Sequence, residues 1–477
     1  MRTIKENLSL TQAAIVIAVI FLLGLFCQTA NFPLIIPLVL LFLGIHLFVI
    51  QKSSYTLFLQ LGLLLTLLVF GSHSLVTYTQ ATPYYIPVAG IAMLTMLLFN
   101  DIELAFLMSL AGSMMTALIT GGGINHFLIF LLGGICGAYF VRGARTRGTL
   151  MSAGFAVAFV QIIAVILVTA DVPAMINRSF LMKTLVPLAL NGIIFVPMVM
   201  STLKIFELWF GVLTNFSLAE LSDFNQPLLR RMILEAPGTY HHSLIVSNMA
   251  ETAAEAIGAN SLLTRVGAYY HDIGKMVKPE YFTENQLLGG NKHDRIEPSI
   301  SRLVILNHVK EGVDLARKHK LNKKIIAFIV QHHGTSLMHY FYCKALEDAD
   351  DESTIKEENY RYPGPKPQRR ETAIVLLADS VEAATRALDE ANPVKINDVV
   401  RKIINNKFID GQLDECHLTL KEIDLIAQTF TRVLSAMYHG RIKYPDKKNG
   451  SDSRNRQSAE DNSNSSVPDH PADQDDS

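Results

Sequence analysis

The sequence predicts an all-α protein in two parts: a polytopic bundle of transmembrane helices, followed by a cytoplasmic all-helical domain. Three observations support this fold class. Half of the 477 residues are hydrophobic, yet only 12 charged residues fall among the first 200 positions. Apolar segments of roughly the 17–25 residues that span a bilayer follow one another through positions 1–205. Beyond them, apolar residues recur with a helical period, and no segment alternates as a strand does.

We interpret eight apolar segments as membrane helices: about 11–28, 32–50, 55–75, 84–99, 103–120, 125–141, 150–170 and 183–201. A count of seven is an alternative, because some of these segments could be re-entrant. The first follows "MRTIKEN", as the apolar part of a signal peptide would. Further apolar segments come at once, which favours a retained helix. The predicted partner of this region is the lipid bilayer.

Charges in the short loops predict the orientation. Lys52, the "RGARTRG" cluster at 142–148 and Lys204 fall on one side, whereas the loops "VTYTQATPYY" and "GGGIN" on the other side carry no charge. Because lysine and arginine collect on the inner side, the N-terminus and the polar half are both expected in the cytoplasm. The sequence therefore predicts a multi-pass protein of the plasma membrane with its soluble domain inside the cell.

The polar half divides into three parts. Residues 206–230 read as an amphipathic connector, 231–443 as a helical domain, and 444–477 as a disordered tail poor in apolar residues. In "EAPGTYHHSL" we expect Thr239 to be the N-cap of a helix. The net charge of −1 gives no argument for binding a nucleic-acid polymer. Four cysteines without a CxxC pair fit reduced thiols in a cytosolic domain.

Histidines gather in the helical domain, where nine of the 15 fall between residues 240 and 340. Those that lie on or at the end of predicted helices, together with two aspartates, are His241 or His242, His271, Asp272, His308, His332, His333 and Asp379. Side chains from facing helices build metal sites inside helical bundles. We therefore expect these groups to converge.

This set contains more ligands than one ion needs. It suits two divalent ions, with the carboxylate of the adjacent His271–Asp272 pair bridging them. Nitrogen and oxygen donors without thiolate favour Mn or Fe, with Zn, Co or Ni as in vitro alternatives. Two such ions would stabilise the attacking and the leaving oxygen of a phosphoryl displacement, in which an activated bridging water is the nucleophile.

The motifs "HHSLIVSNMAETAAEAIGAN", "GAYYHDIGK", "LNHVKEGVDLA", "QHHGT", "YRYPGPKPQRRETAIVLLADSVEAA" and "DGQLDECHLTL", in this order, resemble the HD-domain phosphohydrolases. The chain is most similar to the family in which seven membrane helices precede a cytoplasmic HD domain. The resemblance implies a membrane-anchored phosphodiesterase that hydrolyses cyclic di-AMP to pApA. It also implies that His242, rather than His241, joins the other six residues as metal ligands.

The chain departs from that family because only "QTAN" separates the first two apolar segments, where family members usually carry an extracellular domain. The subgroup that acts on cyclic di-GMP has a "GYP" signature, in place of which this chain has "YPGPKP".

Asp272 and Lys275 are the predicted catalytic residues, and Lys275, Lys366 and Arg369 are predicted to contact the substrate. For Lys275 the alternative is an exposed lysine at a helix end. For Lys366 and Arg369 it is a loop that merely orders the chain.

Other functions remain open. The domain could hydrolyse another nucleotide, such as cyclic di-GMP or a guanosine polyphosphate. It could also be a receptor whose HD module only binds nucleotide, and a homodimer is compatible with either.

Overall fold

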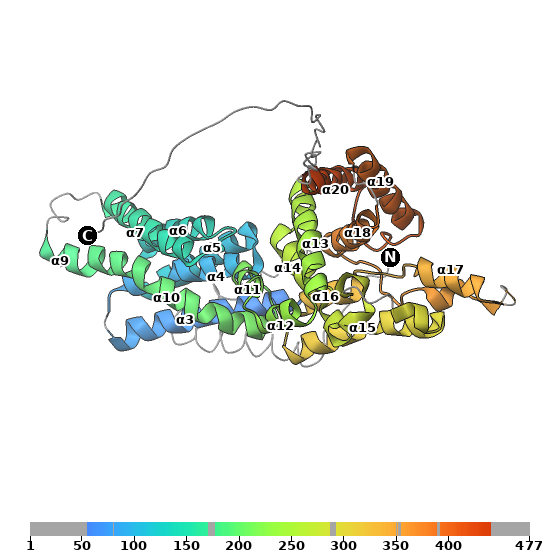
Figure 1. Ribbon diagram of the computed structural model, residues 1–477. Coiled ribbons are helices and arrows are strands. Elements are labelled where there is room, and N and C mark those ends of the chain that lie inside the picture. The colour runs from blue at the N-terminus through green and yellow to red at the C-terminus, as the bar shows by residue number, and fades with distance from the viewer. Residues whose placement is uncertain are drawn as a thin grey trace, which may run out of the picture.

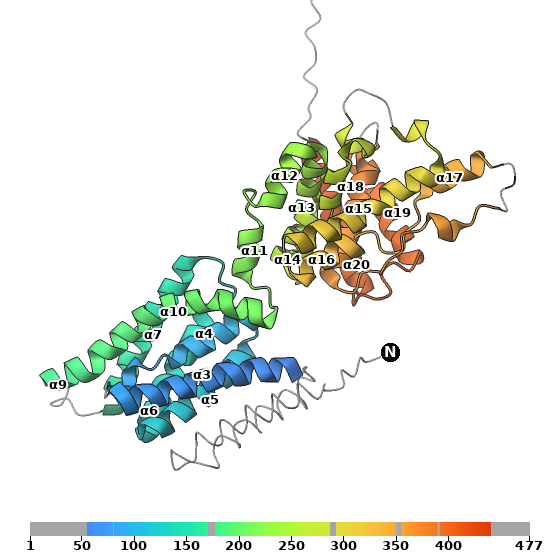
Figure 2. The ribbon, with the colours of Figure 1, turned by 90° about the horizontal axis from the view of Figure 1, so that it is seen from below.

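The computed structural model describes residues 55–79, 81–169, 177–286, 292–349, 351, 354–388 and 392–439. Within these residues every regular element is helical, apart from one isolated bridge between Leu337 and Arg361. Figures 1 and 2 show an N-terminal helical half and a C-terminal one, joined through α10, α11 and α12. The all-α prediction is confirmed for the part of the chain that is described.

The N-terminal half contains five helices that are long and apolar enough to cross a membrane. They are α3 (Tyr55–Thr79), α5 (Ile102–Thr120), α6 (Gly123–Phe140), α7 (Arg147–Thr169), and the composite of α9 (Arg178–Phe180), a π-helical turn (Leu181–Leu185) and α10 (Val186–Phe210). These helices and α4 (Val88–Phe99) correspond to six of the eight predicted segments. The predicted segments 11–28 and 32–50, and the short loop between them, lie outside the described residues.

Helix α4 lies in the centre of the membrane half. It contacts α3, α5, α6 and α10, and residues 88–98 are all buried. At 12 residues, α4 rises about 18 Å, which is less than the bilayer core of about 30 Å. A short 3₁₀ turn, Pro83–Tyr85, leads into it. The segment 84–99, predicted as a span, is therefore a short core helix surrounded by longer ones.

Helices α7 and α10 pack closely at a reciprocal pair of glycines. A Cβ added to Gly154 would lie 2.3 Å from the Gly192 carbonyl oxygen, and one added to Gly192 would lie 2.5 Å from the Gly154 carbonyl oxygen. Small residues allow membrane helices to approach at backbone distance, where van der Waals contact replaces the missing hydrophobic driving force. This glycine pair holds α10, the helix that leads out of the membrane half, against α7.

The junction between the halves is built by backbone caps and one tyrosine. Helix α10 continues to Phe210, inside the predicted connector, and ends where Gly211 adopts a left-handed conformation with φ 63°. The chain then forms α11 (Asn215–Leu221) and α12 (Pro227–Glu235). The Tyr270 hydroxyl donates to the Leu221 carbonyl at 2.9 Å, so the connector touches the residue immediately before His271.

The C-terminal half consists of α13 (Pro237–Ala256), α14 (Ser261–Tyr270), α15 (Pro298–Lys318), α16 (Lys323–Gln331), α17 (His339–Glu347), α18 (Arg370–Arg386), α19 (Pro393–Ile409) and α20 (Leu420–His439). Four 3₁₀ turns follow α14, at Ile273–Val277, Pro279–Tyr281, Thr283–Asn285 and Lys292–Arg295, and another, Glu357–Tyr360, precedes α18. Helix α13 packs on α14, α18 and α20, and α18 is buried along most of its length. The predicted tail, 444–477, lies outside the described residues.

The prediction that Thr239 caps α13 is wrong. The helix begins at Pro237, and Ala236 occupies the N-cap. Proline is favoured at the first helical position because its missing N–H would have no partner there. Thr239 therefore lies within the first turn, where its hydroxyl donates to Glu284 Oε1 at 3.3 Å.

Candidate metal centre

Five elements place the seven predicted ligands. His242 comes from α13, His271 and Asp272 from the end of α14, His308 from α15, His332 and His333 from the end of α16, and Asp379 from α18. Six of these residues are buried and His333 is partly buried. The structure brings all seven together, although the first and the last of them, His242 and Asp379, are 137 positions apart in the sequence.

Asp272 lies at the centre of the cluster. Its Oδ1 is 3.5 Å from His308 Nε2 and 3.4 Å from His332 Nε2. Its Oδ2 is 3.2 Å from His271 Nε2 and 3.7 Å from His242 Nε2. One carboxylate oxygen thus faces each pair of imidazoles, which is the arrangement expected of a ligand shared between two ions.

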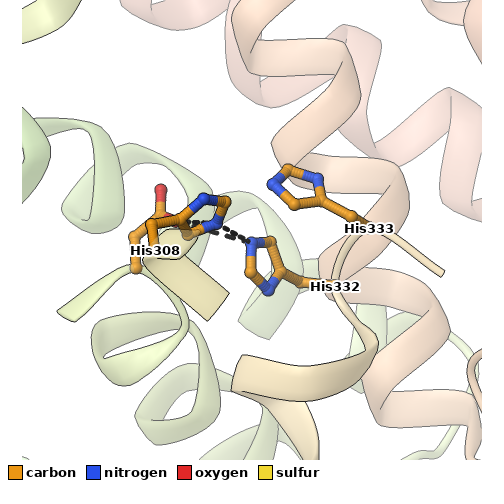
Figure 3. A group of neighbouring side chains, drawn as sticks. His308, His332 and His333 are labelled. Carbon is orange, nitrogen blue, oxygen red and sulfur yellow. Dashed lines mark hydrogen bonds and ion pairs between the residues drawn. The ribbon is translucent and has the colours of Figure 1, made fainter. Parts of the chain in front are cut away.

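The ligands form two groups around that carboxylate. The first is Asp272, His308, His332 and His333, and the second is His242, His271, Asp272 and Asp379; within each group one ligand atom per residue lies within 4.8 Å of the others. Figure 3 shows part of the first group, with His308 and His332 facing each other and His333 beside them. Both groups offer the nitrogen and oxygen donors that suit Mn, Fe or Zn.

Several of the atoms that would bind a metal are buried and make no hydrogen bond. They are His271 Nε2 and both carboxylate oxygens of Asp272, although Asp272 Oδ2 also lies 2.8 Å from Lys275 Nζ in an ion pair. An unsatisfied buried polar group costs on the order of 1–3 kcal/mol, and more when it is charged. A divalent ion in each group would satisfy these atoms, so the residues fit a metal pair.

Hydrogen bonds on the far side of the rings orient the histidines. His271 Nδ1 donates to the Ala268 carbonyl at 2.7 Å, and His332 Nδ1 donates to the Ile329 carbonyl at 2.9 Å. His308 Nδ1 makes the same kind of bond to the Ile305 carbonyl. Because a carbonyl only accepts, each Nδ1 carries a proton, and Nε2 is the ring nitrogen that faces Asp272.

His242 and His333 are held differently. His242 Nδ1 lies 2.6 Å from Glu382 Oε2, so a carboxylate rather than a carbonyl orients this ring. His333 stacks on Tyr362, with ring centroids 4.1 Å apart, and its Nδ1 lies 3.6 Å from Asp379 Oδ2. Both arrangements leave a ring nitrogen directed at the cluster.

The electrostatics favour ionised carboxylates. Burial alone would raise the pKa of Asp272, but His271 and Lys275 hold it well below its usual range. Burial would likewise raise the pKa of Asp379, and hydrogen bonds from His242 and His271 keep it well below that range. Both aspartates are therefore anionic at neutral pH, as metal ligands must be.

Four of the clustered histidines fall into two classes by the direction of their pKa shifts. Burial lowers the pKa of His308 to about 4 and that of His333 well below its usual value, so both are neutral. For His271, burial alone would lower the pKa, but the charge of Asp272 raises it to about 10. Burial would also lower the pKa of His242, which hydrogen bonds with Asp379 and Glu382 raise instead.

Lys275 is not an exposed lysine at a helix end. Its side chain is 13% exposed, and its Nζ lies 2.8 Å from Asp272 Oδ2 and 2.8 Å from Glu284 Oε1. Burial would lower the pKa of Lys275, and these two carboxylates raise it instead. The ammonium therefore compensates the charge at the centre of the cluster.

Lys366 and Arg369 stand apart from the cluster. Lys366 Nζ lies 3.4 Å from Asp414, and Arg369 is exposed at the start of α18. In the described part of the chain, no hydrogen bond or ion pair joins either residue to the seven ligands. Their assignment as substrate contacts stays a prediction.

Sequence reasoning missed four residues beside the cluster: Glu284, Tyr362, Glu382 and Lys407. Glu382 follows Asp379 by three positions on α18, and that helical spacing could have revealed it. Lys407 donates to Ser336 Oγ at 2.7 Å, and burial lowers its pKa while Asp379 opposes the shift. Nothing local in the sequence marks Glu284, whose position depends on the turns after α14.

Comparison with known proteins agrees with this geometry. Residues 32–214 match the family model "7TM receptor with intracellular HD hydrolase", and residues 239–384 match the HD domain. The chain belongs to this family of membrane HD-domain proteins. The HD-domain match contains all seven clustered ligands.

Two curated relatives are named cyclic-di-AMP phosphodiesterase PgpH. The chain is 40% identical over 368 residues to the Bacillus subtilis protein and 42% identical over 375 residues to the Listeria monocytogenes protein. Each alignment covers 76% of this chain and 51% of the relative, so the chain spans about half the length of the curated relatives it matches.

A crystal structure of the Listeria monocytogenes PgpH HD domain in complex with cyclic-di-AMP is 49% identical to this chain. The match covers 46% of this chain and 100% of the crystallised chain, and its TM-score is 0.44.

Proposed function

We propose that this chain is a metal-dependent phosphodiesterase that hydrolyses cyclic di-AMP to linear pApA. The observation that carries the proposal is Asp272, which presents one carboxylate oxygen to each of two ligand groups inside an HD domain. The relatives named cyclic-di-AMP phosphodiesterase favour this substrate among cyclic dinucleotides.

The seven clustered residues are the proposed ligands of two divalent ions, Mn or Fe. When bound, such a pair supplies positive charge to both the attacking and the leaving oxygen of a phosphoryl displacement. Imidazole and carboxylate ligands without thiolate suit these ions.

The protein's own groups prepare the site for that reaction. Asp272 holds its two oxygens toward the two ligand groups, and Lys275 fixes the carboxylate at 2.8 Å. Hydrolysis breaks one phosphodiester bond: the oxygen of water joins phosphorus, and the ribose 3′-oxygen leaves with a proton. The product then carries a 5′-phosphate, as pApA does. Charge grows on the phosphate oxygens, and Lys275, whose Nζ lies 2.8 Å from Asp272 Oδ2, is the cation that we propose to compensate it.

Lys275, Lys366 and Arg369 are the proposed substrate contacts. A cyclic dinucleotide carries two phosphates, and only one of them reacts at a time. Lys366 is 26% exposed and bonds weakly to Asp414, so its ammonium could turn toward the second phosphate. Arg369, exposed beside the "YPGPKPQ" loop, could do the same.

We further propose that the HD domain lies in the cytoplasm beneath the plasma membrane. The arginine cluster at 142–147 and the uncharged loop near residue 80 support this orientation. A homodimer remains a prediction.

A panel of nucleotides tests the proposed activity. The purified full chain in detergent micelles, loaded with Mn, is incubated with cyclic di-AMP, cyclic di-GMP and a guanosine tetraphosphate, and products are separated by chromatography. We expect pApA as the first product and the highest kcat/KM for cyclic di-AMP. Exclusive cleavage of another nucleotide would replace the substrate assignment, and binding without turnover in the metal-loaded chain would support the receptor alternative.

A further inference from the structure

The turn between α15 and α16 is unusually basic. Residues 317–324 read "RKHKLNKK", and we call positions 317–323 the basic turn. Arg317, Lys318, His319, Lys320 and Lys323 are all exposed. Arg317 lies 3.9 Å from Asp314, whereas no carboxylate in the described residues forms an ion pair with Lys318, Lys320 or Lys323. Their charge is available to a partner.

The basic turn lies against the end of the last membrane helix. Asn322 Nδ2 donates at 3.2 Å to the carbonyl of Gly211, the residue that caps α10. A cavity of about 430 Å³ is lined by Lys204 and Leu208 of α10 on one side and by His319 and Lys320 of the basic turn on the other. The turn therefore lies beside the last two turns of α10.

The charges of the last membrane helix, Arg178–Phe210, indicate where the membrane surface lies. Lys183 and Lys204 are 21 positions apart (204 − 183) with no charged residue between them, which corresponds to about 31 Å of helix. This matches the hydrocarbon thickness of about 30 Å. Trp209, five positions further on, is 68% exposed, as an aromatic anchor in the headgroup region would be. Because Lys204 and Lys320 line one cavity, the basic turn lies at the headgroup level.

We propose that the basic turn binds the headgroups of anionic phospholipids around α10 and so holds the HD domain against the membrane surface. An anionic leaflet attracts basic segments beside a span, by a factor of about fivefold for each cation near the surface. This interaction is independent of the proposed enzymatic activity.

The carboxylates near the turn do not cancel its charge. Glu220 pairs with Lys204 at 2.9 Å, and the Ser217 hydroxyl donates to Glu207 at 2.7 Å. Both glutamates are thus engaged, Glu220 with Lys204 of α10 and Glu207 with Ser217 of α11. Lys318, Lys320 and Lys323 remain for the lipid phosphates.

Photocrosslinking of the full chain tests the proposal. A benzophenone amino acid replaces His319, and the protein is placed in nanodiscs of phosphatidylcholine alone or mixed with phosphatidylglycerol. After illumination, lipid adducts at position 319 are counted by mass spectrometry. We expect a several-fold higher yield with phosphatidylglycerol, and a fall in that yield as salt is raised.

A charge-removal variant and a matched control complete the test. The triple variant Lys318→Gln/Lys320→Gln/Lys323→Gln should lose the phosphatidylglycerol-dependent yield. Lys310→Gln/Lys402→Gln/Lys421→Gln removes the same charge from exposed positions outside the cavity and should keep it. Equal yields in the two lipid mixtures, or a full yield from a folded first triple variant, would overturn the proposal.

Discussion

In the membrane half, two buried hydroxyls bond to their own helix: Ser72 donates to the Leu68 carbonyl and Thr95 to the Ile91 carbonyl, each at 2.8 Å. In the HD domain, buried His242, Asp272 and Asp379 instead point at one another from three different elements. A hydroxyl that donates to a carbonyl of its own helix is satisfied inside the lipid bilayer without a partner from another helix. Groups that meet from distant positions, with donor atoms left over, indicate a place where something else binds.

The two halves also differ in charge. From residue 55 to 203, the described residues bury no Asp, Glu, Lys or Arg, whereas the HD domain buries Asp272, Asp379 and Glu382. Buried carboxylates are retained only when cations compensate them. Lys275 supplies one such cation, and divalent ions would supply the rest. Buried carboxylates that need cations therefore distinguish the HD domain, where the metal site is proposed, from the membrane half.

The largest effect is expected for Asp272→Ala. Both ligand groups lose their shared member, so the variant should bind neither ion tightly and turnover should fall by more than about 10³-fold, beyond the usual loss of one electrostatic donor. Elemental analysis and a kinetic assay measure the two quantities. Asp398→Ala, an exposed aspartate on α19, is the matched control and should change neither. Retention of both ions by Asp272→Ala would refute the bridging role.

Lys275→Ala should lower turnover by about 10²–10³-fold while metal content stays intact. The variant also leaves Glu284 buried without its cation, which should cost on the order of 3–5 kcal/mol of stability. Adding Glu284→Gln separates the two effects: the melting temperature should recover and the rate should not. Recovery of the rate in the double variant would make Lys275 purely structural.

Metal binding should release protons at pH 7. The pKa of His271 is raised to about 10 in the metal-free protein, so this ring is protonated until an ion displaces its proton. Affinity should therefore rise with pH between neutrality and pH 10. Calorimetric titration of metal-free protein with Mn, in buffers of different ionisation enthalpy, counts the protons. A count of zero at pH 7 would contradict this protonation state.

The smallest effect on catalysis is expected in the membrane half. Gly192→Val forces α7 and α10 apart at the Gly154 contact and should destabilise the protein by about 1–3 kcal/mol. Turnover for each folded molecule should stay within about twofold. Gly71→Val in α3, where an added Cβ would meet nothing within 4 Å, is the control for a helix glycine outside such a contact. A loss of turnover in folded Gly192→Val would mean that the membrane half participates in catalysis.

Much of this arrangement could be predicted because it depends on local pattern. Long apolar segments indicated α3, α5, α6, α7 and α10, and the His271–Asp272 pair within known motifs indicated the cluster. The buried position of Lys275 was not predictable, since Glu284 reaches it only through the turns after α14. The start of α13 was misplaced because both Pro237 and Thr239 can begin a helix, and local residues do not decide between them.

The central claim is that Asp272 joins two metal sites in the HD domain, and the stoichiometry of binding tests it most directly. Full-length protein is stripped with a chelator and titrated with Mn, while bound metal and cyclic di-AMP turnover are followed together. We predict two ions for each chain, magnetically coupled in the electron paramagnetic resonance spectrum, with turnover rising only as the second ion binds. Full activity with a single bound ion would contradict the account.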